Sequence, residues 1–377
     1  MGASISKKPV VSFLFKSLSD NGVIRVLLTL AQGFIERGLQ VEILVIKAQG
    51  NGQIWLPAGV KVIELKHQIR GVHQFLYLFA LARYLRQHQP AALICGDGLN
   101  FASIAKRLAR VQTQVVITSH NNLSDYLQHK SAKYRNSLMG YLLRRFLWFY
   151  SWADYIVPVS QGVADDLVKI AGRPLERMRV IYNPVVTPEL LEKAKQPIDH
   201  PWFAPGQPPV ILGVGRFEVQ KDFPTLIRAF ALVQQQMPVR LMILGEGQER
   251  PQLEALIHEL GLAAKVALPG FVSNPYAFMS KAAAFVLSSV HEGLPTVLIE
   301  AIATGTPAVS TDCPSGPAEI LNYGHYGRLV PVGDVEALAE AILTTLTQPT
   351  DTQALRQQAQ KFSDENAVNS YLELLQI

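Results

Sequence analysis

Short apolar runs of strand length alternate with amphipathic stretches along most of this chain. In the first half, a run at 10–15 is followed by a stretch at 24–36 in which apolar residues recur with helical spacing. Such alternation predicts a parallel sheet with helices on both faces, because parallel strands need crossover connections. The runs that we predict as strands of the first half lie at 10–15, 41–46, 91–95, 115–118 and 155–159.

The same alternation begins again after a proline-rich span. Seven prolines crowd residues 184–209, a composition typical of a linker, and one short helix is predicted there at 189–195. The strands predicted in the second half lie at 210–214, 240–244, 265–268, 285–289 and 307–311. The chain is therefore predicted to be α/β, with Rossmann-like domains at 1–183 and 210–360, a linker at 184–209, and a C-terminal segment at 361–377 that is helical from 365 to 375.

Two glutamates eight residues apart, Glu292 and Glu300, flank a turn that we predict to begin a helix. Pro295 suits the first helical turn, because its φ is already helical and its missing N–H would have no partner there. The N–H groups and the dipole of a helix start bind phosphate, and carboxylates on either side can bind hydroxyls. A ligand with both features is a nucleotide sugar. The alternative is a solvated helix face, the usual place for two glutamates.

Polar residues also follow other predicted strands, where ligands of parallel sheets bind. Arg216 and Lys221 come after the run at 210–214, and they offer a bidentate guanidinium and a compact ammonium to a diphosphate. His120 follows the run at 115–118. The alternatives are two surface cations near a helix start and an ordinary surface or core histidine.

Seven segments stand in a characteristic order and spacing: Asn21-Gly22-Val23-Ile24-Arg25, Thr118-Ser119-His120, Ile181-Tyr182-Asn183-Pro184, Gly213-Val214-Gly215-Arg216-Phe217, Lys221-Asp222, Leu244-Gly245-Glu246-Gly247, and the Glu-x7-Glu pair Glu292 and Glu300. In this order and spacing, they resemble the retaining glycosyltransferases of family four, whose GT-B architecture has two Rossmann-like domains facing across a cleft. The resemblance covers nearly the whole chain.

The resemblance implies roles for these residues. Arg216 and Lys221 would hold the donor diphosphate and stabilise the departing nucleoside diphosphate. Glu292 would face the hydroxyls of the transferred sugar, Glu300 would bind the ribose, and His120 would reach the reaction centre as a positioning donor or charge stabiliser. The remaining substrate-binding residues that it implies are Gly22, Val272, Gly293, Leu294, Thr296 and Val297. Where the family often has Gly-Gly-x-x-Arg, Asn21 replaces the first glycine, which leaves the geometry of that loop open.

The resemblance also implies retention of the anomeric configuration and a C-terminal helix that packs on the N-terminal domain. The nucleotide sugar is a co-substrate, so no cofactor is expected. The sequence has no Asp-x-Asp pair and no Cys/His cluster with ligand spacing, and transfer is therefore expected to be metal-independent. The segment at 312–321 is similar to one in transferases that build bacterial surface polysaccharides and lipid-linked oligosaccharides, which favours a UDP-linked hexose or N-acetylhexosamine.

The amino-acid composition limits the classes of protein to which the chain can belong. The 377 residues are 49% hydrophobic and 17% charged, which excludes a disordered chain and leaves room for two domains. Cys95 and Cys313 are the two cysteines and lie far apart, so we expect buried thiols and a reducing cytoplasm. The sequence shows no transmembrane segment and no signal peptide. The expected location is cytoplasmic, with peripheral attachment to the inner face of the membrane as a further hypothesis.

The charge of the chain is uneven. Between Glu64 and Asp154 there are twelve Lys and Arg residues and two acids, a local balance of +10 in a chain of net charge +5. Within this region, 130–150 combines five cations with six aromatic residues. It could lie on an anionic membrane as a basic amphipathic helix, or pack its aromatic residues in a core. We therefore predict a lipid-linked or saccharide acceptor and an anionic membrane surface as partners, and no nucleic acid.

Three other classes compete with a transferase. A sugar-nucleotide epimerase has the same fold, but it leaves the basic first half without a role. A dinucleotide oxidoreductase needs Gly-x-Gly-x-x-Gly after a strand, and the segment at 213–218 lacks the third glycine. A non-catalytic sugar-nucleotide-binding subunit would be expected to have lost Glu292 or Lys221, and both are present.

Overall fold

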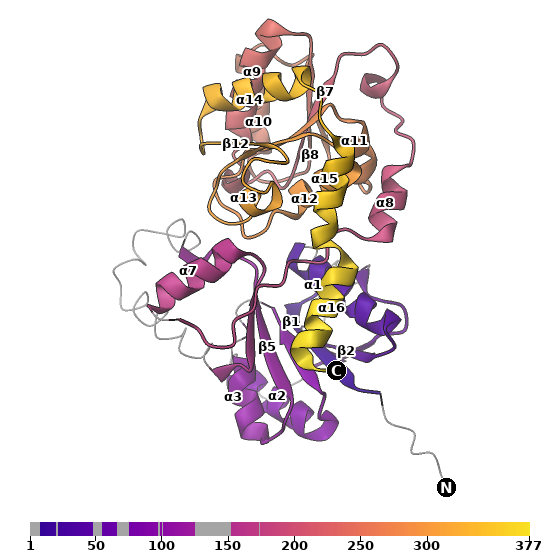
Figure 1. The fold of residues 1–377 in the computed structure, drawn as a ribbon, viewed down its shortest axis with the longest axis vertical. Coiled ribbons are helices and arrows are strands. Elements are labelled where there is room, and N and C mark those ends of the chain that lie inside the picture. Colours follow the sequence, from indigo (N-terminus) through magenta and orange to yellow (C-terminus); the bar gives the residue numbers. More distant parts are fainter. Residues whose placement is uncertain are drawn as a thin grey trace. The chain divides into compact units, whose positions relative to one another are not determined.

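The computed structural model describes residues 8–19, 22–47, 55–65, 75–96, 99, 101–124, 152–172 and 174–377. The chain divides into two compact units. Unit 1 comprises Met1–Pro184 together with Asp364–Ile377, and unit 2 comprises Val185–Ser363. Unit 1 is thus made from two separate stretches of sequence, the indigo to magenta part of Figure 1 and the yellow C-terminal helix.

Unit 1 contains a six-stranded sheet of order β3-β2-β1-β4-β5-β6, in which all neighbouring strands are parallel. The five predicted strands are present. The sixth, β3, has mostly exposed side chains at the sheet edge and therefore no apolar run to reveal it. The strands are β1 (Val10–Ser17), β2 (Gln40–Lys47), β3 (Lys61–Glu64), β4 (Ala92–Cys95), β5 (Gln114–Ser119) and β6 (Tyr155–Pro158), and the helices are α1 (Gly22–Glu36), α2 (Phe75–His88), α3 (Phe101–Ala109), α7 (Gln161–Ala171) and α16 (Asp364–Leu375).

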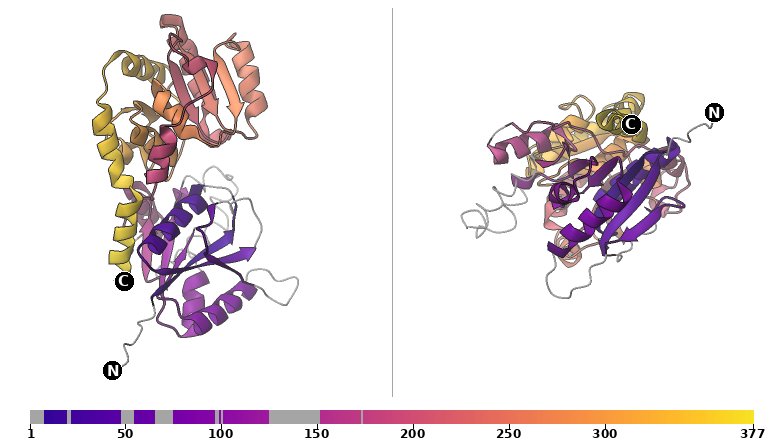
Figure 2. Two further views of the ribbon diagram at one scale, coloured as in Figure 1. Left: turned by 90° about the vertical axis from the view of Figure 1, so that its right-hand side faces the viewer. Right: turned by 90° about the horizontal axis from the view of Figure 1, so that it is seen from below.

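Helix α16 lies along α1, and both helices bury apolar residues in the core of unit 1 (Figure 1 and the left view of Figure 2). Gly33 permits the close approach, since a Cβ at this position would lie 2.4 Å from Cγ2 of Val368. At the rim, Nη1 of Arg37 donates to Oδ1 of Asn369 at 2.7 Å. The last residues of the chain thereby complete the core of the first unit.

Unit 2 repeats the plan with a parallel sheet of order β12-β11-β10-β7-β8-β9. Its five predicted strands are present, and β12 is a three-residue edge strand too short to be recognised in the sequence. The strands are β7 (Val210–Val214), β8 (Arg240–Leu244), β9 (Val266–Gly270), β10 (Ala284–Leu287), β11 (Ala308–Thr311) and β12 (Arg328–Val330). The helices are α8 (Pro188–Ala194), α9 (Phe223–Gln236), α10 (Arg250–Glu259), α11 (Pro275–Lys281), α12 (Thr296–Thr304), α13 (Pro317–Ile320), α14 (Val335–Thr347) and α15 (Thr352–Ala359).

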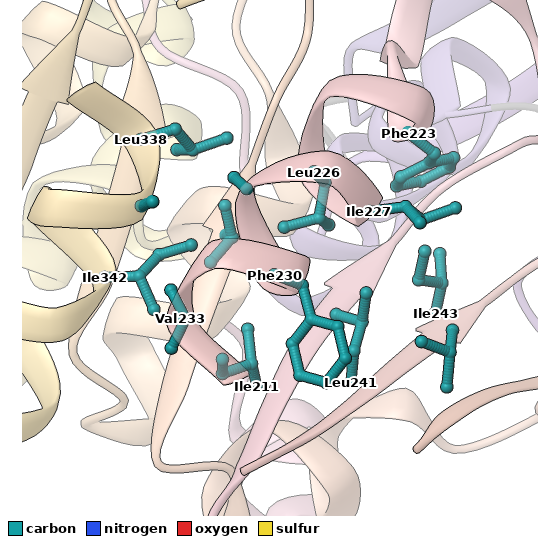
Figure 3. Close-up of a cluster of buried hydrophobic side chains, with 14 of the residues drawn as sticks. Ile211, Phe223, Leu226, Ile227, Phe230, Val233, Leu241, Ile243, Leu338 and Ile342 are labelled. Carbon is teal, nitrogen blue, oxygen red and sulfur yellow. The ribbon is translucent and has the colours of Figure 1, made fainter. Parts of the chain in front are cut away.

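A large core cluster of unit 2 lies between its sheet and helices α9, α10 and α14, and Figure 3 shows its side chains from the sheet, α9 and α14. Phe230 of α9 packs among β-strand residues such as Ile211 and Leu241, and Ile342 of α14 joins the same cluster. Each of these four side chains is fully buried. Burial of one such side chain contributes about 1.5–3 kcal/mol, so this cluster fixes the helix α9 that follows the loop of Arg216 and Lys221.

The proline-rich span at 184–209, for which the sequence predicts a linker, lies almost wholly in unit 2 and is partly packed there. Helix α8 contacts α11, and Nδ2 of Asn274 donates to Lys193 O at 2.9 Å. The N–H of Val185 donates to Phe362 O at 2.9 Å, and Val186 forms a parallel bridge with Ser363. The chain therefore enters and leaves unit 2 through two paired segments.

Among the helices of the described residues, none combines the length and the apolar character that crossing a lipid bilayer requires.

Candidate active site

Hydrogen bonds between loops hold together the carboxyl end of the unit 2 sheet. Gly215 N, after β7, donates to Leu244 O at 3.0 Å. Gly245 N, after β8, donates to Gly270 O at 2.9 Å. The loops after β7 and β8 are thus bonded to the last residues of the neighbouring strands β8 and β9, at the sheet edge where ligands of parallel sheets bind.

Two glycines make this contact possible. Gly245 has φ +145°, and a Cβ there would lie 1.8 Å from Gly215 O. Gly247 has φ +159°, and a Cβ there would lie 2.3 Å from Phe217 O. Backbone of this kind is accessible almost only to glycine. The predicted segment 244–247 therefore has a structural reason for its glycines, which is the close approach of the β7 and β8 loops.

The central contact of this edge joins Lys221 and Glu292. Lys221 ends the short 3-10 helix η4 (Val219–Lys221), and its Nζ lies 2.6 Å from Oε1 of Glu292 in the loop after β10. The two side chains are 15% and 9% exposed. The structure therefore brings together, from positions far apart in the chain, a cation and a carboxylate that the sequence predicts at one site. The attraction between two poorly hydrated charges offsets the cost of removing them from water only where their geometry is well fixed.

Three hydrogen bonds hold the two loops that bear this pair. Nε2 of Gln220 donates to His291 O at 2.8 Å, and Val290 N donates to Gln220 O at 2.9 Å. Oγ of Ser288 donates to Lys221 O at 2.7 Å. Gln220 and Ser288 are not among the site residues predicted from the sequence. The partners of these two residues lie about seventy positions away in the sequence, so no local pattern predicts the hydrogen bonds. The one indication in the sequence is that both residues are close to predicted site residues.

Helix α12 begins beside the ion pair. The sequence predicts Pro295 inside its first turn, whereas the structure places it one position earlier, at the N-cap, with ψ 102°. The fixed φ of proline suits either position, so the sequence alone does not distinguish them. No side chain in the described part of the chain caps this helix, and its first turn closes when Leu298 N donates to Pro295 O at 3.1 Å. The N–H groups of Thr296 and Val297 lie before Leu298 in the first turn of the helix. N–H groups at this position of a helix can bind phosphate.

Gly316 supports the loop before α12. Its φ is +95°, and a Cβ there would lie 2.5 Å from Cδ of Pro295 and 3.1 Å from Gly293 O. The loop after β11 therefore packs directly on 293–295, which includes Gly293 and Leu294 of the predicted phosphate site. This explains the glycine at 316 within the segment 312–321.

Two further acidic or thiol groups are buried near α12. Glu300 lies in the second turn of the helix, and its exposure as a whole residue is 6%, similar to the whole-residue value of 8% for Glu292. Cys313 is 3% exposed. Burial raises the pKa of the Cys313 thiol, and the negative charge of Glu292 raises it further. The thiol thus stays protonated beside the ion pair, and both cysteines are buried and free, as the sequence predicts.

The other predicted residues of unit 2 are more exposed. Nη1 of Arg216 lies 2.6 Å from Oε1 of Glu218, and the Arg216 side chain is 68% exposed. A surface pair of this kind contributes little stability, so a ligand anion can replace the glutamate at small cost. Val272 is half-buried after β9, and the preceding ring of Phe271 is 74% exposed.

Two predicted residues belong to unit 1. His120 follows β5 and is 7% exposed, and its Nε2 lies 2.9 Å from Oγ1 of Thr118. Gly22 is the first residue of α1, and no atom of the described residues lies within 4 Å of the position that a Cβ would take. Both residues follow the carboxyl ends of strands of their own sheet, while Asn21 lies outside the described residues.

The basic segment at 130–150 also lies outside the described residues. Within the described residues, no three His, Cys, Asp or Glu side chains are grouped so that they could hold a metal ion.

The carboxyl end of the unit 2 sheet thus has the ammonium of Lys221, the start of helix α12, and the buried carboxylates of Glu292 and Glu300. The ammonium and the helix amides can bind a polyanion, and the carboxylates can accept hydrogen bonds from hydroxyls. A phosphorylated sugar derivative has both kinds of group.

Two family models match the chain. Residues 195–362 match the family described as Glycosyl transferases group 1, and residues 20–188 match Glycosyltransferase Family 4. Together these matches cover most of both units.

Individual proteins that are similar to this chain are also glycosyltransferases. The N-acetylgalactosamine-N,N'-diacetylbacillosaminyl-diphospho-undecaprenol 4-alpha-N-acetylgalactosaminyltransferase of Campylobacter jejuni is 32% identical over 249 residues, which are 66% of this chain and 64% of that protein. The match thus spans just under two thirds of that relative. The lipopolysaccharide core biosynthesis glycosyltransferase LpsE of Rhizobium meliloti is 30% identical over 272 residues, which are 71% of this chain and 76% of that protein.

Solved structures share the fold. The Anabaena protein HepE, solved in complex with UDP-glucose, has a TM-score of 0.76 and 21% identity, with 98% of this chain and 99% of that chain covered. At this identity the similarity concerns the fold alone. That fold is GT-B, with two α/β units that each contain a parallel sheet.

Proposed function

Because this chain belongs to the family-four glycosyltransferases of GT-B fold, we propose that it transfers a hexosyl or N-acetylhexosaminyl group from a UDP-linked sugar. The proposed acceptor is lipid-linked or a polysaccharide. Transfer proceeds with retention of the anomeric configuration and without a metal ion.

The main support for a nucleotide-sugar donor is the ion pair of Lys221 and Glu292 beside the start of α12. Its two members are 15% and 9% exposed, and Nζ lies 2.6 Å from Oε1. A diphosphate can take the place of Glu292 as the partner of the ammonium, and the carboxylate is then left to accept hydrogen bonds from sugar hydroxyls. One ligand satisfies both groups when its sugar is attached directly to its diphosphate.

In the proposed reaction, the bond between the anomeric carbon and the diphosphate oxygen breaks, and its electron pair stays on that oxygen. An acceptor hydroxyl oxygen forms the new bond to the same carbon, and its proton passes to an oxygen of the departing diphosphate. Lys221, Arg216 and the amides at the start of α12 neutralise the charge that develops on the leaving group. Stabilisation of developing charge by fixed groups often contributes more to catalysis than any other effect.

The relatives guide the choice of donor and acceptor. The name of the Campylobacter relative contains a diphospho-undecaprenol and an N-acetylgalactosaminyl transfer, and the Rhizobium relative belongs to lipopolysaccharide core biosynthesis. The Anabaena structure contains UDP-glucose. These names support a UDP-linked donor and an acceptor on a lipid or a polysaccharide.

Two alternatives remain, a sugar-nucleotide epimerase and a non-catalytic binding subunit. An epimerase would convert the donor into its epimer, or release the free epimeric sugar with water as the second substrate, in either case without any acceptor, whereas a transferase would need an acceptor. A binding subunit would bind the donor and leave it intact. Incubating the protein with a UDP-sugar, with and without a lipid-linked saccharide, separates the three classes.

A thermal-shift panel tests the donor class. We expect UDP and a UDP-sugar, but not GDP or ADP, to raise the Tm by several degrees, because a ligand at 100 times its Kd stabilises a protein by about 2.7 kcal/mol. Lys221→Met should lose most of this shift. Lys265→Met, at an exposed lysine of the same unit, should keep it. If no nucleotide or nucleotide sugar raises the Tm, the proposed function fails.

A stripe on α2 and α3 supports contact between unit 1 and an anionic membrane. Phe79 is 62% exposed and Leu108 is 40% exposed. Nη2 of Arg86 donates to Leu108 O at 2.6 Å, which joins the end of α2 to the end of α3. The cations of these two helices and the residue after them are Arg83, Arg86, Lys106, Arg107 and Arg110, with no acid in either helix. Of these, Lys106 is ion-paired, with its Nζ 2.7 Å from Oδ2 of Asp154. Apolar side chains among cations fit the surface of an anionic bilayer.

Vesicle binding tests this surface. Combining Arg83→Glu with Arg107→Glu is expected to weaken binding to vesicles that contain phosphatidylglycerol by about tenfold or more, since each basic residue near the surface contributes about 1 kcal/mol. Arg228→Glu, an exposed position on α9, provides the same charge change in unit 2. Co-sedimentation at low and high salt measures the effect. Equal sedimentation of the double variant and the control would argue against this surface.

A further inference from the structure

The side chain of Arg250, the first residue of α10, contacts three segments at the carboxyl end of the unit 2 sheet. Its Nε and Nη2 donate to the two carboxylate oxygens of Glu246 at 2.9 and 2.7 Å. Its Nη2 also donates to Leu268 O, within β9, at 3.1 Å. The guanidinium carbon lies 5.4 Å from the centroid of the Phe217 ring. One side chain thus joins the loop after β7, the loop after β8 and the strand β9.

The bond between Arg250 and Glu246 is bidentate, and its geometry is specific to arginine. A lysine has no planar fork and cannot bond to both oxygens of a carboxylate in fixed directions. Hydrogen bonding to Arg250 lowers the pKa of Glu246, so both partners are charged at neutral pH. Their side chains are 26% and 52% exposed. Ion pairs at such exposure contribute little stability unless they are bidentate or part of a network, and this pair is both.

The pair packs against the turn that ends β9. A Cβ on Gly270 would lie 3.0 Å from Oε1 of Glu246 and 3.9 Å from Nη2 of Arg250. Gly270 has φ +91°, and its carbonyl accepts the bond from Gly245 N. Two residues later the chain reaches Val272, which the sequence predicts at the donor site. The pair therefore supports the backbone that leads to Val272.

Phe217 connects Arg250 to the loop that bears Lys221. The N–H of Phe217 donates to Glu246 O at 2.8 Å, and its ring is fully buried. The same ring meets that of Phe223, the first residue of α9, edge-on at 5.6 Å between centroids. Lys221 lies in the short segment between the two phenylalanines. A change in the position of the guanidinium would therefore reach the backbone on both sides of Lys221.

We propose that Arg250 is a positioning residue for the donor, which holds the loops after β7 and β8 against the end of β9 and so fixes the surface that binds the nucleotide. The inference rests on the proposed function for the identity of this ligand. Arg250 acts through Glu246 and Phe217 and does not itself have to contact the nucleotide. Its remaining bond, to Glu254 at 2.8 Å, joins two residues of α10, connects no loops, and has no part in this role.

Arg250→Lys tests the proposal, because it keeps the positive charge and removes the fork. We expect UDP to bind about tenfold more weakly and the KM for the donor to rise by a similar factor, since a hydrogen bond to a charged group contributes about this much. The kcat should stay close to that of the wild type, because a contact that acts on binding alone leaves turnover unchanged. Calorimetric titration with UDP and initial rates measure these quantities.

Arg328→Lys is the matched control, because the Nη2 of Arg328 also donates to a side-chain oxygen, that of Gln348 at 2.6 Å. It should bind UDP like the wild type. A merely structural role would lower the Tm of Arg250→Lys and leave the affinity for UDP unchanged. That result would overturn the inference, as would a fall in kcat without a rise in KM.

Variants of the two acidic partners of Arg250 test the route of the effect. Glu246→Gln should also weaken UDP binding, whereas Glu254→Gln should not. Combined with Arg250→Lys, Glu246→Gln should add no further loss, because both changes break the same contact. Independent losses that multiply in the double variant would show that Arg250 does not act through Glu246, and would refute the proposal.

Hydrogen exchange of the full-length protein without ligand gives a readout that requires no nucleotide. Peptides that cover 245–247 and 269–272 should exchange several-fold faster in Arg250→Lys than in the wild type and Arg328→Lys. Unchanged exchange in these peptides would contradict the positioning role. If UDP does not bind the wild type, the proposed function fails, and the donor role of Arg250 fails with it. If UDP binds the wild type and Arg250→Lys equally, only this inference fails.

Discussion

Replacing Glu292 with glutamine is expected to lower kcat for sugar transfer by about 100-fold or more, while leaving UDP binding intact. Removing one fixed hydrogen-bonding group that acts on the transition state costs about this much in other enzymes. Glutamine has the size of glutamate and can still contact Lys221, but it cannot balance the charge of the ammonium. The loss of that balance leaves Lys221 freer to bind a diphosphate. The variant should therefore separate donor binding from turnover.

The measurements for Glu292→Gln are the initial rate of transfer and the rise in Tm caused by UDP. Glu254→Gln is the matched control, because Glu254 is also ion-paired, here to Arg250 at 2.8 Å, but is 56% exposed on α10. The control should transfer sugar at the wild-type rate. Breaking a poorly hydrated pair also destabilises a protein, so the Tm without ligand should fall for Glu292→Gln more than for the control. Wild-type turnover of Glu292→Gln would remove the proposed role of this carboxylate.

Replacing Gly245 with alanine should destabilise unit 2 and abolish the UDP-induced rise in Tm. The new Cβ would lie 1.8 Å from Gly215 O, and φ +145° is strained for alanine. A strained backbone and an overpacked contact each cost about 1–3 kcal/mol, so a loss of about 2–6 kcal/mol in the free energy of unfolding is expected. The loop of Arg216 and Lys221 would have to move to relieve the contact.

Gly261→Ala provides the control for backbone strain. Gly261 also has a positive φ, +68°, but among the residues that the structure describes nothing lies within 4 Å of the position that a Cβ would take. Its cost should be about 1 kcal/mol, with the UDP response unchanged. Urea unfolding gives the free energies, and the thermal-shift assay gives the UDP response. Equal losses in the two variants would mean that the contact between Gly245 and Gly215 is unimportant.

Much of the fold was predictable, because both sheets are built from central strands buried on two faces. The strand at 210–214 was predicted at the bounds that β7 has, since four of its five positions are buried. Edge strands such as β3 lack that signal, because one of their sides faces solvent. The proline-rich span was predicted as a linker from composition, which contains no information on how α8 packs against α11.

The site was predictable in its residue types but not in its contacts. The segment around Glu292 and Glu300 indicated a helix start, and the structure has one at Thr296. The partner of Glu292 could not be deduced, because Lys221 precedes it by 71 positions and only the order of strands brings the two together. The hydrogen bonds of Gln220 and the bond from Arg250 to Leu268 depend on distances between strand ends, which no spacing in the sequence encodes.

The segments through which the chain enters and leaves unit 2 are hydrogen-bonded to each other, which determines how the two units can be separated. Val185 N bonds to Phe362 O at 2.9 Å, and Val186 bridges Ser363, so the two ends of this unit are neighbours. In topological terms, unit 2 is an insertion into unit 1. Excising it leaves Pro184 and Asp364 close enough for a short peptide to rejoin them. Joining its own ends would permit circular permutation, which domains with adjacent termini tolerate well.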